Sequence, residues 1–179
     1  MAYIREIRGH TPQVGENTFL AETAVLVGDV TVGRDCSIWY NAVLRGDVNT
    51  ITIGDRTNIQ DGVVLHTIYD KAKHPSQTII GNDVSVGHNA IIHGAVIGDN
   101  CLIGMGATLL SGCKIGSGCI IGAGAVVAGN MTVPDNALVV GLPGKVLKPT
   151  TEEQRAYTIA DAKHYVELAK KQLEAVGEE

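Results

Sequence analysis

Branched aliphatic residues recur at every sixth position along most of the chain. The rhythm is broken by a three-residue insertion before Ile53, a longer insertion from about Tyr69 to Thr78, and the loss of one residue after Ile92. The repeated positions are Val14, Leu20, Leu26, Val32, Ile38, Leu44, Ile53, Ile59, Leu65, Ile80, Val86, Ile92, Ile97, Ile103, Leu109, Ile115, Ile121, Val127, Val133 and Val139. A fixed short period of this kind predicts a repeat architecture in which each unit buries its aliphatic residue against its neighbours.

The residues after each aliphatic position predict a corner. The third residue after it is usually Asn, Asp or Gly, which best tolerate a left-handed backbone, and the fourth is small. Examples of the third position are Asn17, Asp35, Asn41, Asp83, Asn89, Asn100, Gly106, Gly118 and Asn130. Each hexad is therefore interpreted as a short strand and one corner, and three hexads as a triangular coil. About seven such coils would stack at the usual strand spacing of ~4.8 Å.

The C-terminal segment has a different period. Thr150 or Thr151, followed three residues later by Glu153 or Gln154, resembles a capping box. Apolar residues then follow at helical spacing, at Ile159, Ala162, Val166, Ala169, Leu173 and Val176. This predicts a β-helix domain over residues 1–149 and an amphipathic helix, from about 152 to 176, within residues 150–179. The helix is expected to pack along the prism or against a neighbouring subunit.

Composition narrows the function classes. The 179-residue chain has a formal charge of -5 and only 4% aromatic residues. A net negative charge disfavours nucleic acid as a partner, and no apolar run approaches the roughly 20 residues that span a membrane. The first residues lack the apolar stretch of a secretion signal, so we expect a cytoplasmic protein with reduced thiols.

The four cysteines all occupy the small inward position of the repeat. They are Cys36, Cys101, Cys113 and Cys119. Their spacing does not fit a thiolate metal site, so we expect buried free thiols. Cys101 and Cys119 are one coil apart and should stack at neighbouring levels without a disulfide.

Three of the six histidines align when the repeat is folded into coils. His66 and His93 both follow the aliphatic residue of the third face, one coil apart, in the same column as Arg45. Asp61 and His88 form a second column, beside a corner. If three prisms pack around a three-fold axis, His88 of one subunit can face His66 and His93 of the next. Three imidazoles around an open position are typical of a catalytic zinc site, whereas a solitary histidine is more often a surface residue.

Specific segments resemble known families. The repeat from Val14 to about Lys148 is similar to the hexapeptide-repeat proteins, which implies a left-handed parallel β-helix. Within that group, Asn41–Asp47, Ile53–Asp61, His66, Val86–His88 and His93 resemble the gamma-class carbonic anhydrases. The resemblance covers nearly the whole chain. It implies a homotrimer that hydrates CO2 to bicarbonate by means of a metal-bound hydroxide, with Zn²⁺, or alternatively Fe²⁺ or Co²⁺, at each subunit interface.

The same resemblance implies individual roles. His66 and His93 would bind the metal from one subunit, and His88 from its neighbour. Arg45 and Asp61 match an ion pair between subunits, Gln60 matches the residue that orients the metal-bound water, and Asn58 and Asp47 match polar residues that line the site.

Proton transfer is where the chain departs from the family pattern. Val48 replaces a glutamate of the best-characterised archaeal type, and the loop Tyr69–Pro75 is short and net basic. The remaining candidates for carrying the proton are Asp70, His74 and Tyr165, although packing is the expected role of Tyr165. We therefore expect weak CO2 hydration limited by proton transfer.

Two other functions remain open. One is a hexapeptide acyltransferase using acyl-CoA, suggested weakly by Gly141–Lys145 and by the pair His74-Pro75. The other is a non-catalytic, metal-bearing trimeric scaffold.

Overall fold

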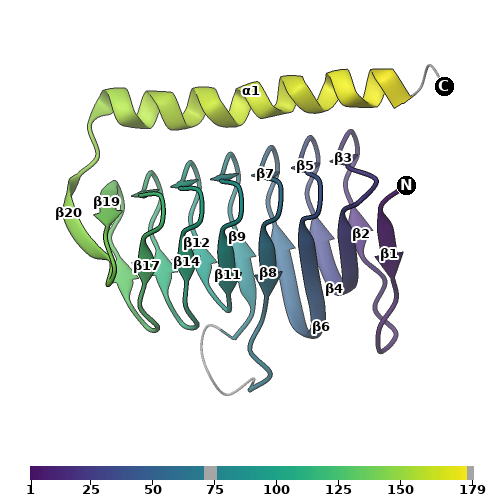
Figure 1. The fold of residues 1–179 in the computed structure, drawn as a ribbon, viewed down its shortest axis with the longest axis horizontal. Helices are drawn as coiled ribbons and strands as arrows, with labels where there is room; N and C mark the ends of the chain where they lie inside the picture. Colours follow the sequence, from purple (N-terminus) through teal and green to yellow (C-terminus); the bar gives the residue numbers. More distant parts are fainter. Residues whose placement is uncertain (71–75, 177–179) are drawn as a thin grey trace.

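The six-residue pattern folds into a parallel β-solenoid of about seven coils (Figure 1). The computed structural model describes residues 1–70 and 76–176. Equivalent aliphatic residues lie directly above one another, as in the run Leu44, Leu65, Ile92 on successive strands. The predicted left-handed parallel β-helix with a C-terminal helix is confirmed.

Most strands are only two or three residues long because a corner follows almost every aliphatic position. In chain order they are β1 (Tyr3–Arg5), β2 (Gln13–Val14), β3 (Phe19–Leu20), β4 (Val25–Val32), β5 (Ser37–Ile38), β6 (Val43–Ile53), β7 (Asn58–Ile59), β8 (Val64–His66), β9 (Thr78–Ile80), β10 (Ser85–Val86), β11 (Ile91–His93), β12 (Val96–Ile97), β13 (Leu102–Ile103), β14 (Thr108–Leu109), β15 (Lys114–Ile115), β16 (Ile120–Ile121), β17 (Val126–Val127), β18 (Thr132–Val133), β19 (Ala137–Val140) and β20 (Lys145–Pro149).

The strands form the three faces of a prism. The first face contains β2, β9, β12, β15 and β18, and the second contains β3, β5, β7, β10, β13, β16 and β19. The third contains β8, β11, β14 and β17, and the long strands β4 and β6 bend so that each contributes to both the third and the first face. Antiparallel β20 pairs with β19 at the C-terminal end.

The predicted corners adopt the expected backbone. Asn41 and Asn89 have φ values of 60° and 58°, and the glycines at the same repeat position, Gly106 and Gly118, both have a φ of 67°. This left-handed region is accessible to asparagine and glycine at low cost. The chain therefore turns sharply after each strand and keeps its aliphatic residues inside.

The interior contains the predicted thiols. Cys36, Cys101, Cys113 and Cys119 are free and buried. The Cys101 thiol donates a hydrogen bond to the Gly116 carbonyl, and Cys119 donates one to the Pro134 carbonyl, each at 3.1 Å. Burial raises the pKa of Cys36 to about 11 and that of Cys113 to about 12, which keeps both thiols protonated.

One helix, α1 (Glu152–Val176), runs back along the solenoid from its C-terminal end toward its N-terminal end (Figure 1). It contacts β3, β5, β7 and β10 of the second face, so it packs on its own prism. Its N-terminus is closed by a capping box between Thr151 and Gln154. The Gln154 N–H donates to Thr151 Oγ1 at 3.1 Å, and the Thr151 N–H donates to Gln154 Oε1 at 2.9 Å. Within the described residues, no helix is both long and apolar enough to cross a membrane.

The buried stripe of α1 differs from the predicted one. Ala162 and Ala169 are buried as expected, but Ile159 is 50% exposed and Leu173 is 37% exposed. Thr158 is buried instead, and Tyr165 contacts the aromatic cluster formed by Phe19 and Trp39. The small buried residues let the helix approach the second face closely. The side of the helix that carries Tyr165 packs on the aromatic cluster, so part of the more apolar stripe faces solvent.

Candidate metal centre

Strand pairing places His66 and His93 side by side on the third face. Each ends its strand, β8 or β11, and the two residues are register partners. Leu65 and Ile92 beside them point inward and are fully buried, so both imidazoles point outward. His66 Nδ1 lies 3.1 Å from His93 Nε2, and the ring centroids are 5.1 Å apart. The predicted column is thus present, with two ring nitrogens directed at each other.

The other nitrogen of each ring has its own partner. His66 Nε2 lies 3.0 Å from Asp47 Oδ1, and His93 Nδ1 lies 2.8 Å from Ser111 Oγ. An acceptor at the outer nitrogen holds a histidine in the tautomer whose inner nitrogen is free to bind a metal. Ser111 was not anticipated from the sequence. The repeat aligns Leu110 with His93 in the next coil, so the residue directly after Leu110 was a candidate to contact His93.

The local electrostatics keep the charges appropriate for metal binding. Burial, reinforced by the neighbouring His66, lowers the pKa of His93 and so favours its neutral, ligating form. For Asp47, partial burial works against ionisation. Hydrogen bonds from Arg45 and His66 outweigh this effect and lower the pKa of the carboxyl group. The neutral form of His93 is therefore favoured, close to an ionised aspartate.

His88 lies at the corner after β10, and a buried amide network holds this corner in place. Gln60 Oε1 accepts a hydrogen bond from the His88 backbone N–H at 3.2 Å, while Gln60 Nε2 donates to Asn58 Oδ1 at 3.1 Å. Asn58 in turn donates to Ser85 Oγ at 2.8 Å. Gln60 and Asn58 are only 5% and 1% exposed, so the network is rigid.

The His88 side chain itself is turned to the outside. It is 40% exposed, and its Nδ1 lies 2.8 Å from Asp61 Oδ2 in the coil above. Asp61 and His88 therefore share a column, as the repeat predicts. Asp61 gives His88 the same kind of carboxylate partner that Asp47 gives His66, and the Nε2 atom of His88 is left to face outward.

Within one chain, Arg45 pairs with Asp47 and not with Asp61, the partner that the resemblance implies across the subunit interface. Its Nη1 donates to Asp47 Oδ2 at 2.7 Å. Asp61 is engaged with His88, and both Arg45 and Asp61 remain about half exposed. An ion pair between Arg45 of one subunit and Asp61 of another stays a prediction.

The candidates for proton transfer differ in their structural environment. Tyr165 packs edge-on against Trp39, with ring centroids 5.7 Å apart, and burial raises its pKa. This arrangement agrees with the packing role. Asp70 is at the edge of the described part of the chain, and His74 lies outside the described residues.

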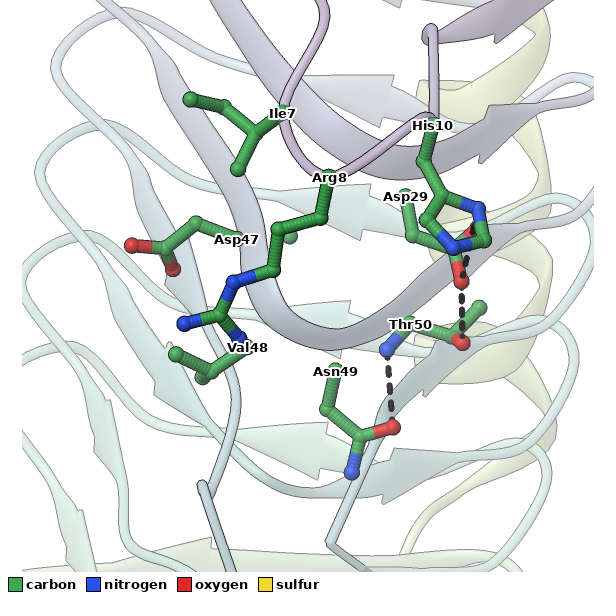
Figure 2. Close-up of a pocket in the computed structure, with 9 residues that line it drawn as sticks. Ile7, Arg8, His10, Asp29, Asp47, Val48, Asn49 and Thr50 are labelled. Carbon is green, nitrogen blue, oxygen red and sulfur yellow. Dashed lines mark hydrogen bonds and ion pairs between the residues drawn. The ribbon is translucent and has the colours of Figure 1, made fainter.

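A polar cavity of about 110 Å³ lies beside the site, between the N-terminal hairpin and the bend of β6 (Figure 2). Asp47 and Val48 line one side, and His10 lines the other. Asp29 lies beside His10 and accepts a hydrogen bond from Thr50 Oγ1 at 2.8 Å. Val48, which the resemblance places where the archaeal type has a glutamate, therefore faces a space large enough for several water molecules.

The His66–His93 pair fits a metal ion. Zinc–nitrogen bonds of about 2.0–2.1 Å in a tetrahedral site separate two imidazole nitrogens by about 3.3 Å, close to the distance observed here. Among the residues that the structure describes, no three His, Cys, Asp or Glu side chains of one chain form a metal-binding cluster. One chain thus presents two ring nitrogens at a spacing that a tetrahedral metal site would need.

Comparison with known proteins agrees with this geometry. The model for "Bacterial transferase hexapeptide (six repeats)" matches residues 11–46, 77–109 and 94–129. The chain is 53% identical to "Probable carbonic anhydrase" of Methanocaldococcus jannaschii, covering 87% of this chain and 95% of that one. It is 40% identical to "Gamma carbonic anhydrase 2, mitochondrial" of Arabidopsis thaliana over 89% of its own length, but spans only 58% of that protein.

A solved structure extends the likeness to three dimensions. The Bacillus cereus protein described as a "putative acetyltransferase" superposes with a TM-score of 0.91, at 38% identity and 96% coverage of both chains. High coverage at these levels of identity establishes a common family, whose members are described both as carbonic anhydrases and as an acetyltransferase. The chain belongs to the gamma carbonic anhydrase family of hexapeptide-repeat proteins.

Proposed function

We propose that the protein is a gamma-class carbonic anhydrase that catalyses the reversible hydration of CO2 to bicarbonate at metal sites shared between the subunits of a homotrimer. The observation that carries this proposal is the His66–His93 pair. Its two inner nitrogens are 3.1 Å apart, and its outer nitrogens are held by Asp47 and Ser111.

Zn²⁺ is the proposed metal, and Fe²⁺ or Co²⁺ would suit the same imidazole ligands. When bound, such an ion supplies the Lewis acidity that makes a water molecule nucleophilic at neutral pH. His66 and His93 hold the ion through the two directed nitrogens, and Asp47 and Ser111 fix the orientation of their rings.

The third ligand is His88 of a neighbouring subunit. His88 precedes His93 by five residues, so it lies about a third of a strand spacing above His93 along the prism and about two-thirds below His66. If neighbouring prisms stand parallel, this is the height of the gap between the two rings. Val64 and Ile91, beside the pair on the third face, are 38% and 45% exposed, which suits a face covered by another subunit.

Gln60 is proposed to act in two ways. Its amide oxygen fastens the His88 corner, and its amide nitrogen, already hydrogen-bonded to Asn58, has a second N–H with which to orient the attacking water. Arg45 is proposed to exchange its contact with Asp47 for the partner subunit's Asp61 on assembly, which would secure the interface next to the metal.

Proton release is proposed to limit turnover. Val48 provides no carboxyl group at the position where the archaeal type has a glutamate, so the proposed carriers of the proton are Asp70, His74 or an external buffer. Imidazole buffer should therefore raise kcat, and His74→Ala should lower kcat while leaving kcat/KM unchanged. Robust hydration that is independent of buffer would contradict this part of the proposal.

A subunit-mixing experiment tests the shared site. His66→Ala and His88→Ala should each lose the metal. A mixed trimer of the two variants has one interface at which an intact His66–His93 pair meets an intact His88. Random 1:1 mixing should thus restore about a quarter of the wild-type metal content and activity. Mixed trimers, verified by mass, that regain no metal would refute the shared site.

Two alternative functions need separate tests. An acyl-CoA-dependent acyltransferase is suggested by Gly141–Lys145, by the pair His74-Pro75 and by the description of the related Bacillus cereus structure. Saturable acetyl-CoA binding by the metal-free protein would favour it. A non-catalytic scaffold would hold stoichiometric zinc or iron and remain inactive in CO2 hydration with buffer present. The proposed compartment is the cytoplasm, since four unbridged thiols suit a reducing environment.

A further inference from the structure

The coil below the histidines repeats their geometry with apolar side chains. Met105 follows His88, and Leu110 follows His93, by the same 17 residues. Strand pairing confirms that the positions correspond, because Val86 is the register partner of Ile103 and Ile92 that of Leu109. The Gly106 N–H also donates to the His88 carbonyl, which joins the two corners.

Both apolar side chains are exposed to solvent in the single chain. Met105 is 59% exposed and Leu110 is 42% exposed, whereas Leu109 between them in sequence is fully buried. Met105 also lines a largely apolar groove of about 300 Å³ that contains His88 and Gln60, bounded by Tyr157 of α1. An exposed apolar pair that continues two metal-ligand columns marks a contact surface.

We propose that the partner of this surface is a second copy of the chain, in which Met105 of one subunit packs between His93 and Leu110 of the next. The inference rests on the shared metal site, and it extends that interface by one coil. Met105 lies about a third of a strand spacing above Leu110 and about two-thirds below His93, as His88 does relative to His93 and His66. The translation that brings His88 to the metal pair therefore brings Met105 to this gap.

The chemistry of the pair suits such a position. Methionine is flexible and polarizable, so it can fill an irregular space beside an imidazole ring and an aliphatic side chain. The contact would close one side of each metal site with apolar atoms. Water and protons would then have to approach from the side of Asp47 and the polar cavity (Figure 2).

Disulfide trapping tests the contact without measuring activity. In the metal-free Met105→Cys/Leu110→Cys variant, mild oxidation should link the subunits into a covalent trimer on a non-reducing gel. Within one chain Met105 stands at the corner before β14 and Leu110 directly after that strand. At roughly 3.3 Å per extended residue, their Cα atoms are farther apart than the ~4.4–6.8 Å of a disulfide. The native cysteines are buried, so the single variant Met105→Cys should remain unlinked. Met105→Cys/Lys114→Cys, which moves the second thiol to the exposed first-face residue Lys114, should also remain unlinked.

The outcomes separate this inference from the proposed function. A wild-type trimer whose double variant fails to cross-link would overturn the Met105–Leu110 contact alone. A wild-type monomer, measured by light scattering, would overturn the shared site and this contact together. If the cysteine variant does not fold, charged substitutions at the same two positions test the contact instead. Met105→Glu should dissociate the trimer, and Met105→Glu/Leu110→Lys should restore it, whereas a trimer unaffected by Met105→Glu would contradict the proposal.

Discussion

The third face of the prism carries two kinds of coil on one backbone. In the upper coils the residue after the buried aliphatic is Arg45, His66 or His93, and in the next coil it is Leu110. The inward residues Leu44, Leu65, Ile92 and Leu109 are fully buried throughout. The repeat therefore supplies only the buried scaffold. Chemistry enters where a single outward position changes from apolar to basic, next to a coil that carries an insertion.

The insertions belong to the same contrast. The first allows the bend of β6 that carries Asp47, and the second follows His66. The coil that carries Leu110 has neither insertion.

The largest effect is expected from removing a ligand. His93→Ala leaves His66 without its partner nitrogen, so the protein should lose its metal and lower CO2 hydration by more than about 10²-fold. Metal content by elemental analysis and stopped-flow hydration check this. His164→Ala, on the outer surface of α1, is the matched control and should retain both properties. Unchanged metal content in His93→Ala would remove the basis for the site.

The scaffold should respond equally in both kinds of coil. Leu65→Ala and Leu109→Ala each remove a fully buried side chain from the same column, and each should lower the free energy of unfolding by about 2–5 kcal/mol. Denaturant unfolding of the metal-free proteins measures this. A much smaller loss for Leu65→Ala would show that the histidine-bearing coil is packed less tightly than the plain one.

Ser111 links the two kinds of coil, since it lies in the plain coil and contacts His93. Ser111→Ala removes the partner of His93 Nδ1 and should weaken metal affinity about 10–100-fold, measured by competition with a chelator. Ser111→Thr keeps the hydroxyl group and should restore most of the affinity. Equal affinities for the alanine and wild-type proteins would assign Ser111 a purely structural role.

The smallest effect is expected at the corners. Asn89 and Asn130 have φ values of 58° and 61°, so alanine at either position should lower the free energy of unfolding by about 1 kcal/mol, and glycine should be nearly neutral. Only Asn89→Ala should also weaken metal binding, because Asn89 follows His88 directly. A loss of metal affinity in Asn130→Ala would contradict the prediction that only the corner next to His88 affects metal binding.

Much of the site could be predicted because a solenoid converts sequence spacing into spatial spacing. Each coil pairs with the next in a register set by the buried aliphatic residues, so the alignment of His66 with His93, and of Asp61 with His88, follows from counting. The corner asparagines and the buried thiols follow from the same count. No contact between distant parts of the chain was needed for these predictions.

What the sequence determined by itself is therefore the set of strands, corners and columns, because their contacts repeat at a short, regular period. Tertiary structure alone decided which ring nitrogens face each other and which acceptors, Asp47 and Ser111, hold the outer ones. It also decided that Thr151 and Gln154, among the candidate residues, form the capping box, and that Ile159 of α1 is exposed to solvent. These features depend on how side chains from separate elements fit together, as α1 fits against Phe19 and Trp39. No period along the chain encodes that fit.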